Sequence, residues 1–132
     1  MAGADVASDL TGKRILLVDD DADVLATLQA ALRDTKAELL TAGNGDEAVK
    51  IASEQKPDLM VLDLMLPGRS GFLVIEKLKA IVSSDDMPRV IMITGNKGHR
   101  HRIYAESLGV AVYMTKPFRM DRLMEAVTEL LS

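Results

Sequence analysis

The segment Ile15-Leu-Leu-Val-Asp-Asp-Asp-Ala-Asp-Val-Leu-Ala-Thr-Leu28 contains the pattern from which the fold can be predicted. Four consecutive branched apolar residues, 15–18, are typical of a strand that is buried on both faces of a sheet. Four acidic residues then fall within 19–23. Apolar residues follow at helical spacing: Val24, Leu25, Leu28 and Leu32. The segment therefore predicts a buried strand, an acidic loop and a helix, in that order.

The same alternation of strand and helix recurs along the chain. The expected strands cover residues 15–18, 38–42, 59–62, 90–94 and 111–115. The expected helices contain the apolar stripes of residues 24–32, 48–52, 74–82, 103–108 and 123–131. Connections long enough to hold a helix imply a mostly parallel sheet. Because such crossovers are right-handed, the pattern predicts a three-layer α/β domain.

The composition describes one globular domain. The chain has 132 residues, 48% of them apolar and 27% charged, and it contains no cysteine, which excludes thiol catalysis and disulfides. Residues 1–12 are small and polar without periodicity, so we expect a flexible tail followed by a domain over 13–132. No apolar run approaches the roughly 20 residues that a membrane span needs, and the chain does not open on a leader-like segment. We therefore expect a cytoplasmic protein.

The charge is distributed unevenly along the chain. The net charge is −4, but residues 1–66 hold 6 Lys/Arg and 13 Asp/Glu, whereas residues 67–132 hold 10 and 7. An acidic protein is a poor partner for nucleic acid, so we expect none. His99 and His101 in the basic segment 99–102 do not share a helix face, and no further His or Cys is available for a metal site. This segment is best interpreted as the solvated start of a helix.

Polar side chains follow four of the expected strands at the point where each strand ends. Asp19 and Asp20 follow the first strand, Asp63 follows the third, Thr94 closes the fourth, and Lys116 follows the fifth. The carboxyl ends of parallel strands meet at one edge of the sheet, which is where ligands bind in such folds. We therefore expect three carboxylates, a hydroxyl and an ammonium to converge there.

This combination of groups is suited to phosphoryl chemistry. Three neighbouring carboxylates need a counter-charge, and hard oxygen ligands favour Mg²⁺. A cation, the Lys116 ammonium and the Thr94 hydroxyl around one carboxylate would hold a phosphoryl group, whose charge is spread over three oxygens. The central carboxylate is then a candidate nucleophile that forms an acyl phosphate.

Each of these residues also has an ordinary structural interpretation. The acids of 19–23 can cap the first turn of the following helix, and we expect Asp21 to be such a cap. The same run imitates a calcium loop, but Val24 stands where that loop needs Gly and Ala30 where it needs Glu. The ordinary interpretation suffices for each residue alone but does not explain why all of them fall at strand ends.

Four motifs resemble the receiver domains of two-component response regulators over residues 13–132. The motifs are Ile15-Leu-Leu-Val-Asp-Asp-Asp21, Val61-Leu-Asp-Leu-Met-Leu-Pro-Gly-Arg-Ser-Gly71, Ile91-Met-Ile-Thr-Gly95 and Tyr113-Met-Thr-Lys-Pro-Phe118. Any one of them is a weak signal, but all four in this order are highly specific. The resemblance implies a flavodoxin-like (βα)5 fold, doubly wound, with a five-stranded parallel sheet in the order 2-1-3-4-5.

The resemblance also implies a role for each matching residue. Asp63 is similar to the aspartate that takes a phosphoryl group from the phosphohistidine of a histidine kinase or histidine phosphotransferase. Asp20 resembles a direct Mg²⁺ ligand, Asp19 a ligand through water, and Met65 a ligand through its backbone carbonyl. Lys116 is similar to the lysine that contacts a phosphoryl oxygen. Such a domain is a phosphoacceptor switch in signal transduction and not an enzyme in its own right.

Three further positions match residues that change or fix the shape of the family's site. Thr94 and Tyr113 resemble the switch pair, in which the hydroxyl moves to the phosphoryl oxygen and the ring fills the space that it leaves. The Lys116-Pro117 bond would be cis. The resemblance places the output face for a downstream protein on the fourth helix, fifth strand and fifth helix, around 103–131. No effector domain follows Leu131 in this sequence, so we expect either that the switch acts by binding other proteins or that the sequence is a piece of a larger regulator or hybrid kinase.

The chief alternative is an enzyme. Phosphatases of the haloacid dehalogenase type place Asp-x-Asp after their first strand, which would assign Asp19 and Asp21, and they also use a later Thr and Lys. However, this chain has no acidic motif at a strand end after the lysine, because Asp121, Glu125 and Glu129 lie on the last expected helix. Asp63 would also have no role in such an enzyme.

The residues two positions beyond Asp63 and Thr94 are Met65 and Asn96. Members of the family vary at these positions. A bulky apolar side chain such as that of Met65 offers no help to an attacking water. We therefore expect a long-lived phosphorylated form.

Overall fold

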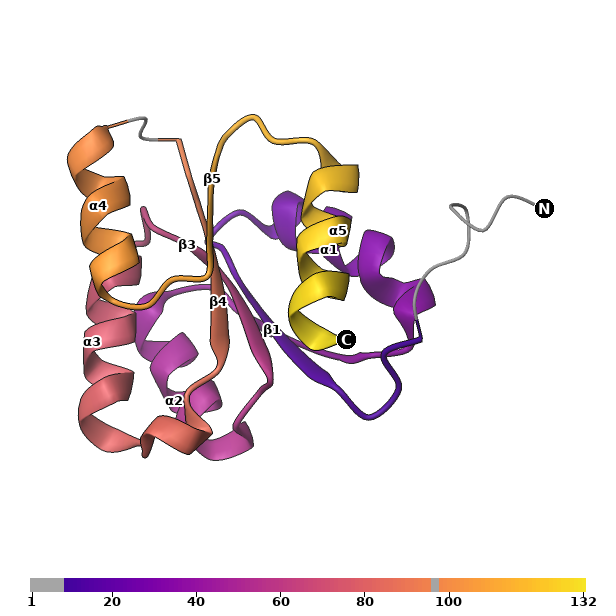
Figure 1. The fold of residues 1–132 in the computed structure, drawn as a ribbon, viewed down its shortest axis with the longest axis horizontal. Coiled ribbons are helices and arrows are strands. Elements are labelled where there is room, and N and C mark those ends of the chain that lie inside the picture. The colour runs from indigo at the N-terminus through magenta and orange to yellow at the C-terminus, as the bar shows by residue number, and fades with distance from the viewer. Residues whose placement is uncertain (1–8, 96–97) are drawn as a thin grey trace.

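The computed structural model describes residues 9–95 and 98–132 (Figure 1). Its strands are β1 (Arg14–Val18), β2 (Glu38–Ala42), β3 (Leu59–Asp63), β4 (Arg89–Thr94) and β5 (Val112–Thr115). Its α-helices are α1 (Ala22–Leu32), α2 (Gly45–Gln55), α3 (Gly71–Ile81), α4 (His99–Ser107) and α5 (Met120–Leu131), and two short 3-10 helices are η2 (Arg33–Thr35) and η3 (Ser84–Asp86). All five expected strands and all five expected helices are present.

The five strands form one parallel sheet in the order β2-β1-β3-β4-β5. The chain first builds outward from β1 to β2, then crosses back to β3 and continues to β5. Neighbouring connections therefore diverge at the β1/β3 boundary, which opens a crevice at the carboxyl ends of these strands. The doubly wound fold and its strand order are those that the resemblance implied.

Helices cover both faces of the sheet, so the domain has three layers. Figure 1 shows α1 and α5 on one face and α2, α3 and α4 on the other. Side chains of β1 alternate between the two cores, since Leu16 and Val18 join the cluster under α2 and α3, while Ile15 and Leu17 join the cluster under α1 and α5. A strand buried on both faces needs continuous apolar sequence, which explains why residues 15–18 were recognisable.

The helices begin earlier than their apolar stripes because polar caps set their first turns. Asp21 caps α1 by accepting a hydrogen bond from the Asp23 N–H at 2.9 Å, which confirms the prediction. Asn44 and Ser70 cap α2 and α3 in the same way, through the N–H groups of Glu47 and Leu73. Each of these caps lies in a loop at the carboxyl end of a strand, so capping also fixes the loops around the crevice.

Helix α4 packs less extensively than the others. It begins at His99, as the basic segment predicted, and Ala105 is the one buried residue in its span of nine. Its side-chain contacts include the edge-on stacking of Tyr104 against Phe72 of α3, with ring centroids 4.9 Å apart, and a hydrogen bond that Tyr104 donates to Glu76. A helix with so little buried surface is held mainly by a few side-chain contacts.

The packed part of the chain begins before the expected boundary at Lys13. Leu10 is 4% exposed, and its N–H donates to the Thr35 carbonyl at 2.7 Å. Leu10 therefore packs against the domain although the expected tail runs to residue 12, while residues 1–8 lie outside the described residues. Within the described parts of the chain, no helix is both long and apolar enough to cross a bilayer.

Candidate functional site

The carboxyl edge of the sheet brings three aspartates together. Oxygen atoms from Asp19, Asp20 and Asp63 all lie within 4.8 Å of one another. Asp19 and Asp63 are only 3% and 5% exposed, whereas Asp20 is open to solvent. Two buried carboxylates and one exposed carboxylate provide the hard oxygen donors that a divalent cation prefers. Asp19, Asp20 and Asp63 are hereafter called the acidic site.

Lys116 supplies the positive charge of the acidic site. Its Nζ lies 3.3 Å from Asp19 Oδ2 and 3.2 Å from Asp63 Oδ2, so one ammonium is shared almost equally between two buried carboxylates. The Lys116 N–H donates to the Thr94 carbonyl at 2.7 Å, and the Lys116-Pro117 bond is cis. The lysine is therefore attached through its backbone to the strand that also carries Thr94.

Backbone groups hold the two buried carboxylates from the opposite side. The Asp21 N–H donates to Asp19 Oδ1 at 2.9 Å, and the Met65 N–H donates to Asp63 Oδ1 at 3.0 Å. Each aspartate thus has one oxygen on a loop amide and the other on Lys116. The Met65 backbone consequently lies directly against the carboxylate of Asp63.

A glycine allows the loop after β3 to close under Asp63. A Cβ on Gly71 would meet the Asp63 carbonyl oxygen at 2.8 Å and the Leu64 Cα at 3.0 Å. The Gly71 N–H donates to the Leu64 carbonyl at 2.9 Å in this close approach. Any side chain at position 71 would therefore push the start of α3 away from the end of β3.

Burial and the charge of Lys116 shift the pKa of Asp63 in opposite directions. Burial raises the pKa of Asp63 above its ordinary value, and the nearby charge of Asp19 raises it further, while the Met65 N–H and Lys116 lower it only in part. Burial lowers the pKa of Lys116, but the carboxylates of Asp63 and Asp19 outweigh this and leave it raised. One ammonium does not fully compensate two carboxylates, so the charge of the site is compatible with a further cation.

Thr94 and Tyr113 lie on the neighbouring strands β4 and β5. Thr94 is fully buried at the end of β4, and it pairs in register with Thr115, two residues beyond Tyr113. Tyr113 is 9% exposed and belongs to the core under α2 and α3, and the guanidinium carbon of Arg102 lies 5.6 Å from the centre of its ring. Burial raises the pKa of Tyr113, so its hydroxyl is neutral at physiological pH.

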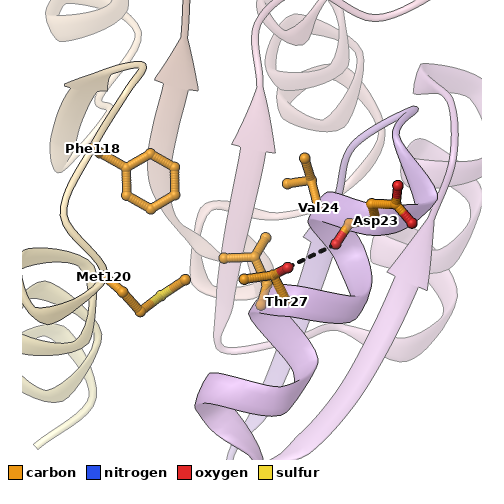
Figure 2. A pocket seen from close by; sticks show the side chains of 6 residues that line it. Asp23, Val24, Thr27, Phe118 and Met120 are labelled. Carbon is orange, nitrogen blue, oxygen red and sulfur yellow. Dashed lines mark hydrogen bonds between the residues drawn. The ribbon is translucent and has the colours of Figure 1, made fainter.

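An apolar groove opens next to the acidic site, between α1 and the segment that leads into α5 (Figure 2). It encloses about 300 Å³. Figure 2 shows Phe118 and Met120 facing Val24 and Thr27 across it, with the Thr27 hydroxyl donating to the Asp23 carbonyl at 2.9 Å. Phe118 stands two residues beyond Lys116, so the groove and the acidic site share one loop. We call this feature the α1/α5 groove.

Sequence reasoning did not identify the α1/α5 groove. Val24 and Leu28 belong to the predicted apolar stripe of α1, but Phe118 and Met120 reach it from the other end of the chain. The local signal for this groove in the sequence is the pair of apolar residues, Phe118 and Met120, that closely follows Lys116-Pro117. The predicted site residues Asp19, Asp20, Asp63, Met65, Thr94, Tyr113, Lys116 and Pro117 all lie among the described residues, whereas Asn96 lies outside them.

The geometry does not favour the phosphatase alternative. That class needs Asp19 and Asp21 together, but the Asp21 side chain is exposed and occupied in capping α1. Asp63, which such an enzyme would leave without a role, lies at the centre of the site beside Lys116.

Comparisons with known proteins agree with this geometry. The family model described as "Response regulator receiver domain" matches residues 15–128. The transcriptional regulatory protein PrrA of Mycobacterium tuberculosis is 37% identical over 122 residues, which are 92% of this chain and 51% of PrrA, so the chain spans about half the length of that relative. Protein PilH of Pseudomonas aeruginosa is 29% identical over 119 residues, or 90% of this chain and 98% of PilH.

A solved structure gives the same result for the fold. The CheY-like receiver domain protein of Methanospirillum hungatei superimposes with a TM-score of 0.82 at 27% identity, covering 90% of this chain and 93% of that one. The comparisons lend no support to a haloacid dehalogenase-type phosphatase.

Proposed function

Because the chain belongs to the family of response regulator receiver domains, we propose that Asp63 accepts a phosphoryl group from a phosphohistidine and forms an aspartyl phosphate. The observation that carries this proposal is the position of the Lys116 ammonium, 3.2 Å from Asp63 Oδ2 at the crevice of a doubly wound sheet. Receiver domains are generally phosphoacceptor switches rather than enzymes with a separate substrate.

The surroundings of Asp63 suit a nucleophilic carboxylate. One oxygen attacks the phosphorus while the bond from phosphorus to the imidazole nitrogen of the donor breaks, and the nitrogen keeps the electron pair. The charge on the transferred group then spreads over three oxygens. Lys116 can neutralise one of these oxygens, while the Met65 N–H keeps the second carboxylate oxygen of Asp63 in place.

The donor set of the acidic site fits Mg²⁺. Asp19, Asp20 and Asp63 provide carboxylate oxygens, and the Met65 carbonyl belongs to the loop that lies against Asp63. In our proposal Asp20 and Asp63 bind the ion directly, Asp19 binds it through water, and Met65 contributes its carbonyl oxygen. When bound, the ion supplies the positive charge that Lys116 alone leaves incomplete.

A direct experiment identifies the acceptor. The protein is incubated with Mg²⁺ and acetyl phosphate, treated with borohydride, which reduces an aspartyl phosphate to homoserine, and digested for mass spectrometry. We expect homoserine at position 63. Homoserine at position 19 would instead support the phosphatase alternative, and an unmodified protein would contradict the proposed function.

Magnesium is expected to stabilise the folded protein. Because the ion binds the folded state and not the unfolded chain, Mg²⁺ at ten times its Kd should raise the free energy of unfolding by about 1.4 kcal/mol. Thermal melts with and without the ion measure this, and a monovalent salt of equal ionic strength is the control. An unchanged melting temperature would contradict a preformed metal site.

Phosphorylation would act through Thr94 and Tyr113. A phosphoryl group adds negative charge and strong acceptor oxygens, so the Thr94 hydroxyl gains by turning toward it. In our proposal the Tyr113 ring then moves into the space beside Thr94, which changes the surface formed by α4, β5 and α5. Four exposed arginines on or next to these elements, Arg100, Arg102, Arg119 and Arg122, are matched in number by four exposed acids, Glu106, Asp121, Glu125 and Glu129. Two of the arginines are already ion-paired, Arg102 with Glu106 and Arg119 with Asp121, so the surface offers a partner charges of both signs.

The α1/α5 groove is suited to the protein that donates the phosphoryl group. A donor protein must bring its phosphohistidine to Asp63. The apolar groove lies on the loop that also carries Lys116, so a donor bound there would be close to the acidic site. We expect Thr27→Arg, which fills the groove from an exposed position, to slow transfer from a phosphorylated histidine kinase roughly tenfold, the effect of losing about 1.4 kcal/mol of binding. Loading from acetyl phosphate should change by less than about twofold, because this small donor needs no groove.

The matched control for this experiment is Ala80→Arg, which places the same side chain on the exposed surface of α3, on the other face of the sheet. It should leave both rates unchanged. Equal slowing of both donors in Thr27→Arg would show that the groove has no separate role in donor recognition.

The phosphorylated form is expected to be long-lived. Met65 places a thioether side chain two residues beyond Asp63, and this group cannot orient a water molecule for attack on the phosphoryl group. Met65→Asn, which introduces a polar amide, should shorten the half-life of the phosphorylated protein about threefold or more. The decay is followed by intact mass after the donor is removed, and identical decay rates would refute this explanation.

A further inference from the structure

Met65 differs in exposure from the other methionines of the described chain. The residue is 61% exposed, which makes it the most accessible large apolar residue among those described. Met60 and Met92 are fully buried in the core. The remaining methionines of the described chain are partly buried: Met87, Met114, Met120 and Met124. Among these residues, chemical reagents in solution should therefore reach the Met65 sulfur first.

The position of Met65 joins this accessibility to the acidic site. Its N–H donates to Asp63 Oδ1 at 3.0 Å, so the residue is attached to the carboxylate that we propose as the phosphoryl acceptor. An unbranched side chain with several rotatable bonds adapts its position easily. A change in polarity at this sulfur therefore occurs on the residue whose N–H holds the carboxylate of Asp63.

We propose that Met65 is an oxidation site through which peroxides shorten the life of the phosphorylated protein. The inference rests on the proposed function of Asp63. In the reaction the thioether sulfur attacks the peroxide, the O–O bond breaks, and one oxygen is transferred to sulfur. The sulfur is oxidised by two electrons to the sulfoxide, and the peroxide is reduced to water or an alcohol. Methionine sulfoxide reductases reverse this modification.

The sulfoxide changes the chemistry beside Asp63 in a definite direction. It converts a flexible apolar side chain into a polar one with a strong hydrogen-bond acceptor. An acceptor at this place can hold and orient a water molecule, whereas the thioether of Met65 cannot. Oxidation should therefore accelerate hydrolysis of the aspartyl phosphate and return the switch to its resting state.

The first test measures site selectivity and does not depend on phosphorylation. The protein is treated with a limiting amount of hydrogen peroxide and mapped by peptide mass spectrometry. We expect the sulfoxide at Met65 to form at least about threefold faster than at Met87, Met114, Met120 or Met124, following exposure. Equal rates at these positions would overturn the assignment of Met65 as the selective site.

The second test measures the decay of the phosphorylated protein. After loading with acetyl phosphate and Mg²⁺, the oxidised wild type should lose its phosphoryl group about threefold faster or more than the untreated protein. Met65→Leu keeps an apolar side chain without an oxidisable sulfur, so peroxide should leave its decay unchanged. Met65→Gln, which imitates the polarity of the sulfoxide, should decay quickly without any oxidant.

The outcomes separate this inference from the proposed function. If the untreated protein accepts a phosphoryl group at Asp63 but oxidation leaves its decay unchanged, Met65 is not a regulatory site and the proposed function stands. If peroxide accelerates decay equally in Met65→Leu, another residue is responsible and the inference is wrong. If no phosphoryl group is accepted at all, both proposals fail.

Discussion

Asp63→Asn is expected to abolish phosphorylation completely and, in the metal-free protein, to raise the free energy of unfolding by about 1 kcal/mol. The loss of phosphorylation follows because an amide is not a nucleophile at this site. The gain in stability follows because Asp63 is 5% exposed and shares one ammonium with Asp19. Replacing a poorly compensated buried charge by a neutral group of the same shape is commonly stabilising.

The stability gain of Asp63→Asn should depend on pH in a defined direction. Because burial raises the pKa of Asp63 above its value in the unfolded chain, ionised Asp63 destabilises the folded state at neutral pH. This destabilisation disappears as the pH falls through the raised pKa and then below the ordinary value of 3.8. The difference in melting temperature between Asp63→Asn and the wild type should therefore be largest near pH 7 and smallest in acid.

The control for both effects is Asp85→Asn, an exposed acid on η3 at the opposite edge of the sheet. This variant should be phosphorylated normally, and its stability should stay within about 0.5 kcal/mol of the wild type. Phosphorylation that persists in Asp63→Asn would refute the proposed acceptor. A metal-free Asp63→Asn protein less stable than the wild type would refute the electrostatic account of the site.

Lys116→Met is expected to have the opposite effect on stability while also preventing efficient phosphorylation. Without the ammonium, the two buried carboxylates keep, among the described residues, only the backbone hydrogen bonds from Asp21 and Met65. Leaving a buried charge unpaired costs about 3–5 kcal/mol, and the partial exposure of Lys116 reduces this to about 2 kcal/mol in the metal-free protein. Phosphorylation by acetyl phosphate should slow by about a hundredfold, since a charge that stabilises the transferring group is lost.

Denaturant unfolding and the kinetics of phosphoryl loading measure these two effects. Lys77→Met is the matched control, because Lys77 is an exposed lysine on α3 away from the acidic site. It should change stability by no more than about 0.5 kcal/mol and leave loading intact. If Lys116→Met is as stable as the wild type, Asp63 and Asp19 do not depend on the ammonium. Normal loading of Lys116→Met would remove Lys116 from the proposed mechanism.

The central part of the fold is predictable from sequence because both-face burial leaves a strong signal. Residues 15–18 and 59–62 have to be apolar throughout, and the polar residues that follow them have to lie at the sheet edge. The same pattern is sufficient to assign Asp19, Asp63, Thr94 and Lys116 to that edge. The strand order depends on the resemblance to receiver domains, since periodicity alone does not determine which strands are neighbours.

Other features depend on contacts that the sequence does not express locally. Helix α2 begins at Gly45, three residues before its apolar stripe, because the Asn44 cap and not hydrophobicity determines its start. The burial of Leu10 depends on a hydrogen bond to Thr35, which lies 25 residues away. The α1/α5 groove combines Val24 with Phe118, nearly a hundred residues apart, so its lining is defined only by the tertiary structure.

The sparse packing of α4 has a consequence for how a signal spreads through the domain. Since Ala105 is the one buried residue of this helix, a shift of α4 relative to β4 and β5 would disturb only a small part of the core under α2 and α3. We therefore expect α4 to open at a lower local free energy than the sheet and its well-packed helices. A covalent change at Asp63 has only to exceed the local free energy that holds α4, which is a small part of the global free energy of unfolding.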